Sequence, residues 1–208
     1  ANPTGVVYSE EEVKQIAEVA RKHDVLVMSD EIYDTFCYDG KCPTIADHYE
    51  KTLVLKGFSK SYAMTGWRLA YAFGGKAVKP LLEEMTKIQQ YTFVCAPSPL
   101  QRAAIAAMDV DMTDYVNKYR KKRDMICEGL KDKFEIVKPG GAFYTFVKAP
   151  ERAGSATKFV EKAIANDLLI IPGNVFSERD THFRISYATT EEKIQRGIEI
   201  LRRIADEE

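Results

Sequence analysis

The chain has 208 residues, of which 45% are hydrophobic and 29% are charged, and this composition excludes a disordered protein. Thirty basic residues stand against 31 acidic ones, which argues against nucleic acid or an anionic membrane as a partner. No apolar stretch is long enough to span a bilayer, and the first residues lack the pattern of a secretory signal. We therefore expect a globular protein of the cytoplasm.

The first predicted helix covers about residues 10–23. A capping box over Ser9–Glu12 begins it, and apolar residues then recur at helical spacing. The continuous apolar run Val25–Met28 predicts a strand buried on both faces, as in a parallel sheet. This strand leads into Ser29 and Asp30, so we expect the Asp30 carboxylate at the strand's carboxyl end.

A second buried strand is predicted for Thr52–Leu55, and the chain then reaches Lys60. Ligands in open α/β sheets gather outside the carboxyl ends of the strands, so Asp30 and Lys60 lie where a site is expected. Leu69–Phe73 predicts a third strand, with Arg68 at its entrance.

From about residue 77 the pattern becomes helical, and a long, charged helix that suits a bridge between two subdomains ends this stretch. A compact α/β segment begins near residue 134. The expected helices lie at about residues 77–90, 98–108, 112–131 and 155–166, with a final helix from Thr190. The expected strands and apolar runs of the last segment lie at residues 142–147, 168–171 and 182–187.

The cysteines and histidines form no recognisable metal site. Only two of the four cysteines, Cys37 and Cys42, are close in sequence, and their spacing fits no common zinc or redox pattern. The three histidines match no metal or catalytic-triad pattern. We expect the cysteines to be reduced and mostly structural, and we assign no metal.

Lys60 is the strongest candidate for chemistry. It lies in the run Gly57-Phe58-Ser59-Lys60-Ser61-Tyr62-Ala63-Met64-Thr65-Gly66-Trp67-Arg68. An amine that holds pyridoxal phosphate as a Schiff base needs an acid at the ring nitrogen, a phenol or amide at the ring hydroxyl, and a cation at the phosphate. Asp30, Tyr33, Asn2 and Arg68 supply these groups.

These motifs resemble the C-terminal portion of a class I/II, fold-type I pyridoxal-phosphate-dependent aminotransferase, such as the aspartate and aromatic aminotransferases. The similarity runs from Asn2-Pro3-Thr4-Gly5 through Phe183-Arg184-Ile185-Ser186-Tyr187. It implies an α/β fold. Residues 1–112 would be the remaining part of a large cofactor-binding domain with a mostly parallel sheet and flanking helices. Residues 113–208 would be an interdomain helix and a small C-terminal α/β domain.

The resemblance assigns roles to the first group of residues. It implies that Lys60 forms the Schiff base and moves the proton of the substrate's α-carbon. Asp30 would keep the ring nitrogen protonated, although an aspartate after a strand is more often a turn residue or a helix cap. Tyr33 would bond the ring hydroxyl, although an isolated tyrosine is usually a core or rim residue.

Three further residues complete the expected cofactor site. Asn2 resembles the asparagine that shares the ring hydroxyl and reaches the substrate carboxylate, while Asn-Pro-Thr-Gly is also good turn chemistry, and both interpretations hold together. Arg68 resembles the arginine that binds the phosphate, with an ordinary strand-edge arginine as the alternative. Gly57 stands where the family has serine or glycine and offers no side chain, so Ser59 is a weak candidate for a phosphate contact.

Arg184 is the candidate for substrate binding. Phe183, Ile185 and Tyr187 alternate with it, so its side chain is expected on the face opposite the apolar one. The resemblance assigns it to the α-carboxylate of the amino acid, bound bidentately. The alternative is a solvent-facing strand arginine.

The leading functional hypothesis is an aminotransferase that exchanges an amino group between an L-amino acid and a 2-oxo acid. Three alternatives stay open: a related lyase, synthase or decarboxylase with the same cofactor, a regulatory module, and an inactive fragment. A regulatory module would need a basic DNA-binding segment, which is not seen in these residues.

Substrate choice and assembly stay open in part. Aspartate, aromatic and alanine-type donors are all compatible with the sequence. The resemblance implies a homodimer. Because the chain opens on Ala1 without a methionine, we interpret it as a piece of a longer protein, and we expect weak or no cofactor binding by these 208 residues alone.

Overall fold

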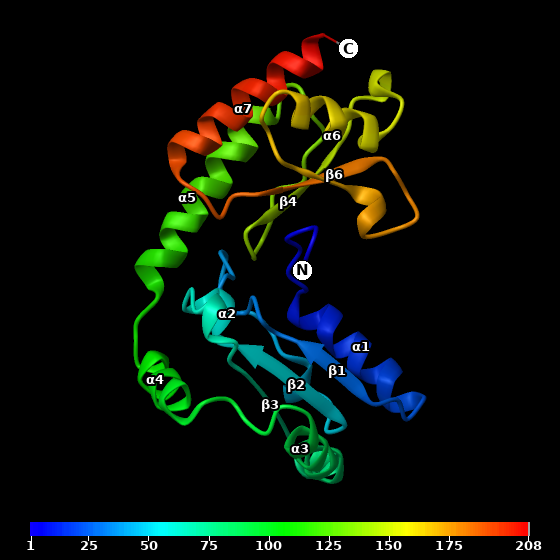
Figure 1. Cartoon of the computed structure of the whole chain (residues 1–208). Helices are drawn as coiled ribbons and strands as arrows, with labels where there is room; N and C mark the ends of the chain where they lie inside the picture. Colours follow the sequence, from blue (N-terminus) through cyan, green and yellow to red (C-terminus); the bar gives the residue numbers. More distant parts are fainter. Residues whose placement is uncertain (208) are drawn as a thin grey trace. The chain divides into compact units, whose positions relative to one another are not determined.

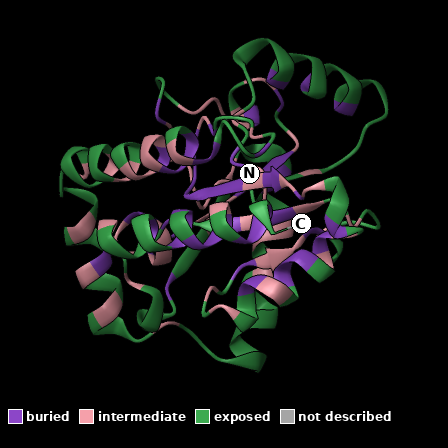
Figure 2. Cartoon of the chain, turned by 90° about the horizontal axis from the view of Figure 1, so that it is seen from above, coloured by how far each residue is buried: buried purple, intermediate pink, exposed green. Residues whose placement is uncertain are grey.

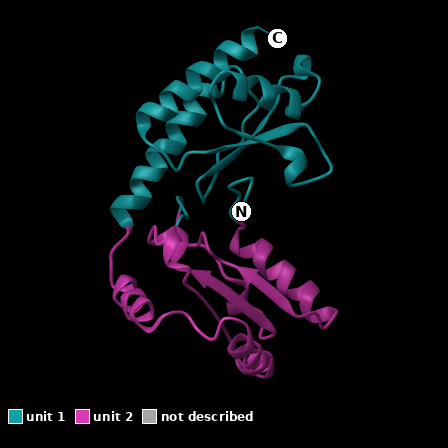
Figure 3. Cartoon of the chain, in the orientation of Figure 1, with its two compact units in different colours: residues 1–7, 36–39, 113–208 teal, residues 8–35, 40–112 magenta. Residues whose placement is uncertain are grey.

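The computed structural model describes residues 1–207, which form the two compact units coloured separately in Figure 3. Unit 1 contains Ala1–Val7, Phe36–Asp39 and the chain from Thr113 onward, and unit 2 contains Tyr8–Thr35 and Gly40–Met112. The chain changes unit between residues 112 and 113. The two short segments that group with unit 1 were not expected. Among residues 1–207, no helix is both long and apolar enough to cross a membrane.

Unit 2 begins with helix α1, Glu10–Lys22 (Figure 1). The predicted capping box is present: the Ser9 side chain accepts from the Glu12 amide, and the Glu12 carboxylate accepts from the Ser9 amide at 2.7 Å. Val13, Ala17 and Ala20 form the buried stripe of the helix. Spacing and cap together explain why this helix was predicted within one residue of its observed end.

The sheet of unit 2 has the strand order β1-β2-β3, and these strands are Val27–Asp30, Thr52–Gly57 and Ala70–Gly74. Strand β1 runs parallel to β2, and β3 runs antiparallel to β2, so the described part of this sheet is mixed. The central strand β2 is the buried one, with Leu53 and Val54 fully covered.

The expectation that the first strand is buried on both faces was wrong. The strand starts two residues late, at Val27, and Met28 is 61% exposed. Within residues 1–207 strand β1 pairs only with β2, and the apolar cluster beneath α1 covers the face that carries Val27. An apolar run alone cannot tell a central strand from such an edge strand.

Short and long helices complete unit 2. The predicted helix at residues 98–108 is confirmed without change, and the helix predicted at 77–90 is confirmed as a 3-10 turn followed by α3. The helical elements are η1 (Ile45–Asp47), α2 (Phe58–Ser61), η2 (Thr65–Trp67), η3 (Lys76–Val78), α3 (Lys79–Thr92) and α4 (Ser98–Met108).

Unit 1 combines an antiparallel sheet, in the order β4-β6-β5, with three helices (Figure 1). The sheet strands are Tyr144–Lys148 (β4), Ile171–Pro172 (β5) and His182–Ser186 (β6). The helical elements are α5 (Thr113–Leu130), η4 (Glu151–Ala153), α6 (Ala156–Ala165), η5 (Gly173–Val175) and α7 (Glu191–Asp206). The helices predicted for this region are confirmed, while the apolar run at residues 168–171 contributes only its last residue to β5.

The core of unit 1 lies between β6 and the helices, where Figure 2 shows buried residues along the sheet and along the inner helix faces. Phe159, Phe183 and Tyr187 are completely buried there. Phe183 and Ile185 point into this core, and Arg184 between them is half-buried. The predicted alternation of β6 is therefore confirmed.

The segment Phe36–Asp39 joins unit 1 through specific contacts. The Tyr38 amide donates to the Gly140 carbonyl at 2.8 Å, and the Ala142 amide donates to the Phe36 carbonyl at 2.8 Å. The buried guanidinium of Arg123 on α5 lies 4.7 Å from the centre of the Tyr38 ring. These contacts link residues far apart in the chain, which is why local pattern did not reveal them.

Candidate functional site

The carboxyl ends of β1 and β2 bring two of the expected site residues to one edge of the sheet. The strands are parallel, and Asp30, the last residue of β1, stands opposite Leu55 of β2. The Asp30 side chain is exposed and accepts a hydrogen bond from the Ile32 amide at 3.2 Å. A carboxylate at this edge is available to a ligand beyond the strand ends, as the sequence predicted.

Lys60 lies just beyond the same edge. Strand β2 ends at Gly57, which serves as the N-cap of α2, and Lys60 is the third residue of this four-residue helix. Phe58 anchors α2 in an apolar cluster with Leu69 and Ala104, and its amide donates to the Leu69 carbonyl at 3.2 Å. Lys60 and its neighbour Ser59 are both half-buried.

Tyr33 lies on the turn that follows β1, and it is half-buried. The turn sits beside a charged group that the sequence reading did not identify. The Lys56 ammonium lies 2.7 Å from the Asp34 carboxylate and 3.7 Å from that of Glu31. Burial lowers the pKa of Lys56, but the hydrogen bond that its ammonium donates to Asp34 and the charges of Asp34 and Glu31 outweigh burial, so the pKa is raised and the lysine stays charged.

Arg68 is not part of a strand. It ends the 3-10 turn η2 in the left-handed conformation, with φ 52° and ψ 46°, two residues before β3 begins. Its Nη1 donates to the Thr65 carbonyl at 3.0 Å, and the side chain is exposed. A non-glycine residue held in this region of backbone space is strained, which is typical of positions that orient a functional side chain.

In unit 1 the structure joins the two residues expected to bind substrate. Arg184 Nη1 donates to Asn2 Oδ1 at 2.8 Å. The guanidinium carbon also lies 4.5 Å from the centre of the Tyr144 ring and 4.8 Å from that of the Phe176 ring. Its Nε is buried and has no hydrogen-bond partner among the described residues.

This arrangement leaves one edge of the arginine fork for a ligand. The Tyr144 and Phe176 rings restrict the guanidinium, and the bond to Asn2 uses Nη1. The Nε donor is buried, and no hydrogen bond within the described residues replaces the one it loses to water. A carboxylate can accept two parallel hydrogen bonds from one edge of a guanidinium. The site therefore fits a carboxylate ligand.

The turn that carries Asn2 depends on close backbone packing. The Gly5 amide donates to the Ala1 carbonyl at 2.8 Å, and Gly5 has φ +69°. A Cβ at Gly5 would lie 2.5 Å from Pro139 Cβ and 2.6 Å from the Tyr144 carbonyl oxygen. The expected turn is confirmed, and glycine is required in it for both conformation and space.

Two buried tyrosines support the same region of unit 1. The hydroxyls of Tyr38 and Tyr187 lie 3.5 Å apart, and both donate to the Ala142 carbonyl. Burial raises the pKa of Tyr38 to about 12 and raises that of Tyr187 further, so both stay protonated as donors.

The aromatic residues that contact Arg184 were not predicted from the sequence. Tyr144 lies in the segment Gly140-Gly141-Ala142-Phe143-Tyr144 and Phe176 in Pro172-Gly173-Asn174-Val175-Phe176, and neither ring was predicted to contact Arg184. The signal available was that each segment pairs a glycine turn with an aromatic residue, but which ring would lie against the arginine depends on tertiary packing.

The donor set of unit 2 fits pyridoxal phosphate. Within this unit, an exposed carboxylate (Asp30), a phenol (Tyr33) and an amine (Lys60) follow the carboxyl ends of adjacent parallel strands, and a guanidinium (Arg68) precedes the third strand. This is the set of groups that the cofactor's ring and phosphate require. Among the described residues, no group of three or more histidine, cysteine or acidic side chains is placed to hold a metal ion.

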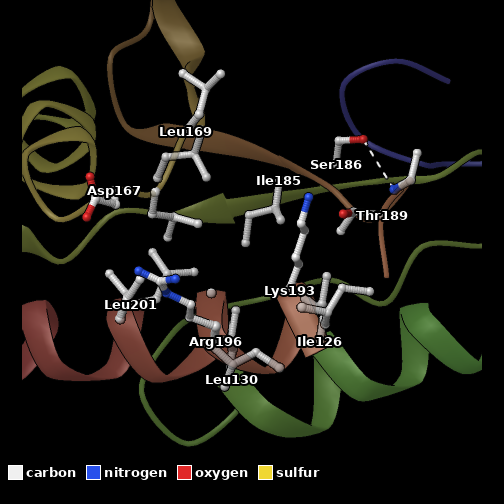
Figure 4. Close-up of a pocket in the computed structure, with 17 residues that line it drawn as sticks. Ile126, Leu130, Asp167, Leu169, Ile185, Ser186, Thr189, Lys193, Arg196 and Leu201 are labelled. Carbon is white, nitrogen blue, oxygen red and sulfur yellow. Dashed lines mark hydrogen bonds between the residues drawn. The ribbon is translucent and has the colours of Figure 1, made fainter. Parts of the chain in front are cut away.

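A cavity of about 770 Å³ in unit 1 lies apart from these residues (Figure 4). Its walls are mainly apolar side chains of α5, β6 and α7, among them Leu130, Ile185 and Leu201, with Lys193 and Arg196 beside them. None of the expected site residues lines it.

Comparison with known proteins gives a consistent picture. The family model described as "Aminotransferase class I and II" matches residues 1–201. The chain is 39% identical over 211 residues to a probable aspartate aminotransferase of Methanocaldococcus jannaschii, and the alignment covers 98% of this chain and 56% of that protein. It is 39% identical over 212 residues to the putative aminotransferase YugH of Bacillus subtilis, with 98% and 54% covered.

The fold is similar to that of a solved enzyme. The crystal structure of an aromatic aminotransferase from Pyrococcus horikoshii OT3 superposes with a TM-score of 0.92 at 32% sequence identity. The match covers 100% of this chain and 58% of that one. The chain thus spans about half the length of the curated relatives it matches.

Proposed function

The chain belongs to the class I and II aminotransferases, and we propose that its protein transfers an amino group between an L-amino acid and a 2-oxo acid through pyridoxal phosphate held covalently by Lys60. One observation carries the proposal. The parallel pair β1–β2 ends in Asp30 on one strand and leads to Lys60 beyond the other, at a single edge of the sheet. An acid and an amine at one edge are the two groups that this cofactor needs most.

The residues of unit 2 have distinct proposed tasks at the cofactor. When bound, pyridoxal phosphate supplies an electron sink for the pair left on the substrate's α-carbon. Asp30 holds the proton on the ring nitrogen, and the Tyr33 phenol donates to the ring oxygen. The Arg68 guanidinium binds the phosphate, with Ser59 as a further hydroxyl donor.

Lys60 has a second proposed task as the general base. In this role the Lys60 amine would take the proton from the substrate's α-carbon and later return it. It is half-buried on a short helix anchored by Phe58, which limits the positions its amine reaches. Anchoring of this kind supports a residue that must both bind and move a proton.

From unit 1 we propose Asn2 and Arg184 as the substrate-binding pair. The free Nε edge of Arg184 binds the α-carboxylate, and the Asn2 amide, oriented by its bond to Arg184, contributes to the ring hydroxyl and to the substrate. Two of the similar proteins bear the names aspartate and aromatic aminotransferase, so we propose a donor from these classes or an alanine-type amino acid.

The proposed assembly is a homodimer in the cytoplasm. Exposed apolar side chains gather at the end of α3, where Tyr91 is 90% exposed and Phe93 is 71% exposed. A partner surface would cover such residues, and a second copy is the simplest occupant in this family. Among the described residues no cysteine forms a disulfide, and reduced cysteines are usual in cytoplasmic proteins.

The test is amino-group exchange between two substrates. The full-length protein with pyridoxal phosphate is given an L-amino acid and a different 2-oxo acid, and both products are measured. We expect one new 2-oxo acid for each new amino acid, and no exchange by Lys60→Ala. Release of carbon dioxide or ammonia without a second amino acid would contradict transamination and favour a decarboxylase or lyase.

A further inference from the structure

The turn that carries Tyr33 extends past the last backbone pairing of β1 with β2. Pairing ends with Asp30 opposite Leu55, and the Glu31 amide makes one more bond to the Leu55 carbonyl, at 2.9 Å. Within the turn, the Asp34 amide donates to the Glu31 carbonyl at 3.1 Å. Beyond Glu31, side chains must therefore fix where the turn lies relative to β2 and α2.

The first of these side-chain contacts is ionic. Lys56 of β2 lies 2.7 Å from Asp34 and 3.7 Å from Glu31, and the three side chains are 26%, 29% and 11% exposed. Glu31 also accepts hydrogen bonds from Ser29 at 3.1 Å and from Thr44. Because the cluster is largely shielded from water, its attraction is stronger than that of a surface pair.

The second contact joins the turn to the helix of Lys60. The Thr35 hydroxyl donates to the Ser61 hydroxyl at 2.8 Å, and Ser61 is only 5% exposed. Thr35 follows Tyr33 by two residues, and Ser61 directly follows Lys60. The bond therefore connects the backbone segments of the proposed phenol and the proposed anchoring amine.

The helix α2 depends on such contacts. It has only four residues, too few to be stable alone, so its orientation is set by what it packs against. Phe58 fixes it in an apolar cluster, and Ser61 fixes it to the turn. Removing the Ser61 bond leaves the helix attached by its apolar residue and by the strand before it.

We propose that Thr35 and Ser61, supported by the Lys56–Asp34 pair, are positioning residues that hold Tyr33 in register with Lys60. We call these four residues the turn clamp. The proposal rests on the proposed function, because it concerns Tyr33 and Lys60 as groups that serve one cofactor. A displacement of about 1 Å in a catalytic group lowers rates strongly, so a clamp at this place affects chemistry as well as stability.

The first test uses the protein without cofactor. Thr35→Val and Ser61→Ala are compared with Thr52→Val, a matched control at a buried threonine of β2 whose hydroxyl has no hydrogen-bond partner among the described residues. We expect hydrogen exchange at the amides of Asp34 and Thr35 to become about tenfold faster in both clamp variants and unchanged in the control. The double clamp variant should match the single ones, because both remove the same bond.

The second test uses the full-length protein with pyridoxal phosphate. The apparent pKa of its visible absorbance band depends on the donor at the ring oxygen, so Tyr33→Phe should shift it. We expect Thr35→Val and Ser61→Ala to shift it in the same direction and by less. In the Tyr33→Phe background, neither clamp variant should shift it further, because the clamp acts through Tyr33.

Three results would overturn the clamp. They are unchanged amide exchange in both clamp variants, equal acceleration in Thr52→Val, and a band shift by the clamp variants that persists in the Tyr33→Phe background. A wild-type protein without an absorbance band that borohydride fixes on Lys60 would instead contradict the proposed function. The exchange measurement would still decide whether the clamp holds the turn.

Discussion

Arg184 is half-buried, and its buried Nε has no hydrogen-bond partner among the described residues. Tyr144 and Phe176 contact the guanidinium and Nη1 donates to Asn2, while Nε stays without a protein partner among the described residues. A buried donor without a partner lowers the stability of the protein, and a bound carboxylate would supply the missing partner. The residue therefore carries the substrate side of the proposal.

Replacing Arg184 with lysine should weaken substrate binding while keeping the charge. Lysine offers a point charge in place of a planar fork, so we expect kcat/KM to fall by about 10- to 100-fold, mainly through a higher KM. Steady-state kinetics with both substrates checks this. The matched control is Arg196→Lys on the exposed part of α7, and equal kinetics for the two variants would contradict the assignment.

Asp124 should make stability depend on acid pH. Burial raises its pKa, but hydrogen bonds from Lys138 and Arg123 outweigh burial and hold the pKa below its ordinary value. A lowered folded-state pKa stabilises the protein above the unfolded-state value, and this contribution disappears as the pH falls through the folded-state pKa.

We therefore expect Asp124→Asn to lower the free energy of unfolding by about 1 kcal/mol at pH 7, and by much less near pH 2 to 3, after allowing for solvent screening. Urea unfolding at both pH values measures the difference. Asp39→Asn is the control, because that carboxylate is 76% exposed and 3.7 Å from the same guanidinium. A cost that is independent of pH would contradict this explanation.

At the scale of elements, glycines allow the turn that carries Asn2 to pack closely against neighbouring backbone. The Gly141 amide donates to the Gly5 carbonyl at 2.9 Å, and a Cβ at Gly141 would lie 2.4 Å from the Phe36 carbonyl oxygen. Gly140 directly precedes Gly141, and a Cβ at Gly140 would lie 3.5 Å from Val7 Cβ, which is an ordinary van der Waals contact. Two of these three glycines are therefore required by space, and one is not.

Alanine substitutions separate the two cases. Gly5→Ala combines a left-handed backbone with a steric conflict and should cost about 2 to 3 kcal/mol of stability, and Gly141→Ala a similar amount. Gly140→Ala should change stability by less than about 1 kcal/mol. Urea unfolding of the three variants checks the order, and a cost at Gly140 equal to that at Gly5 would show that packing is not the cause.

Local elements were predictable because their signals are local. The caps at Ser9 and Thr190 and the apolar spacing behind them define α1 and α7, and the strand ends place Asp30 and Lys60. The exposure of β1, the left-handed turn at Arg68 and the stacking around Arg184 were not predictable. They depend on which segments pack together, and a single sequence does not encode that in any periodic pattern.

At the scale of the whole molecule, each unit brings one part of the proposed chemistry. Unit 2 contains Asp30, Tyr33, Ser59, Lys60 and Arg68, which we assign to the cofactor, and unit 1 contains Arg184 for the substrate and Asn2 for both. The chain corresponds to about half of its relatives, so the complete activity is a property to be measured in the full-length protein. Lys60 is the central residue of the proposed function, because the proposed aminotransferase activity requires Lys60 to bind the cofactor.

The most direct measurement is borohydride reduction of the full-length protein with pyridoxal phosphate, followed by peptide mapping. We predict a visible absorbance band that reduction removes, with the cofactor mass fixed on the peptide that contains Lys60. Lys60→Ala should lose both signals, while Lys79→Ala, at a lysine whose side chain is 73% exposed on α3, should keep them. An unchanged band and label in Lys60→Ala would contradict the account.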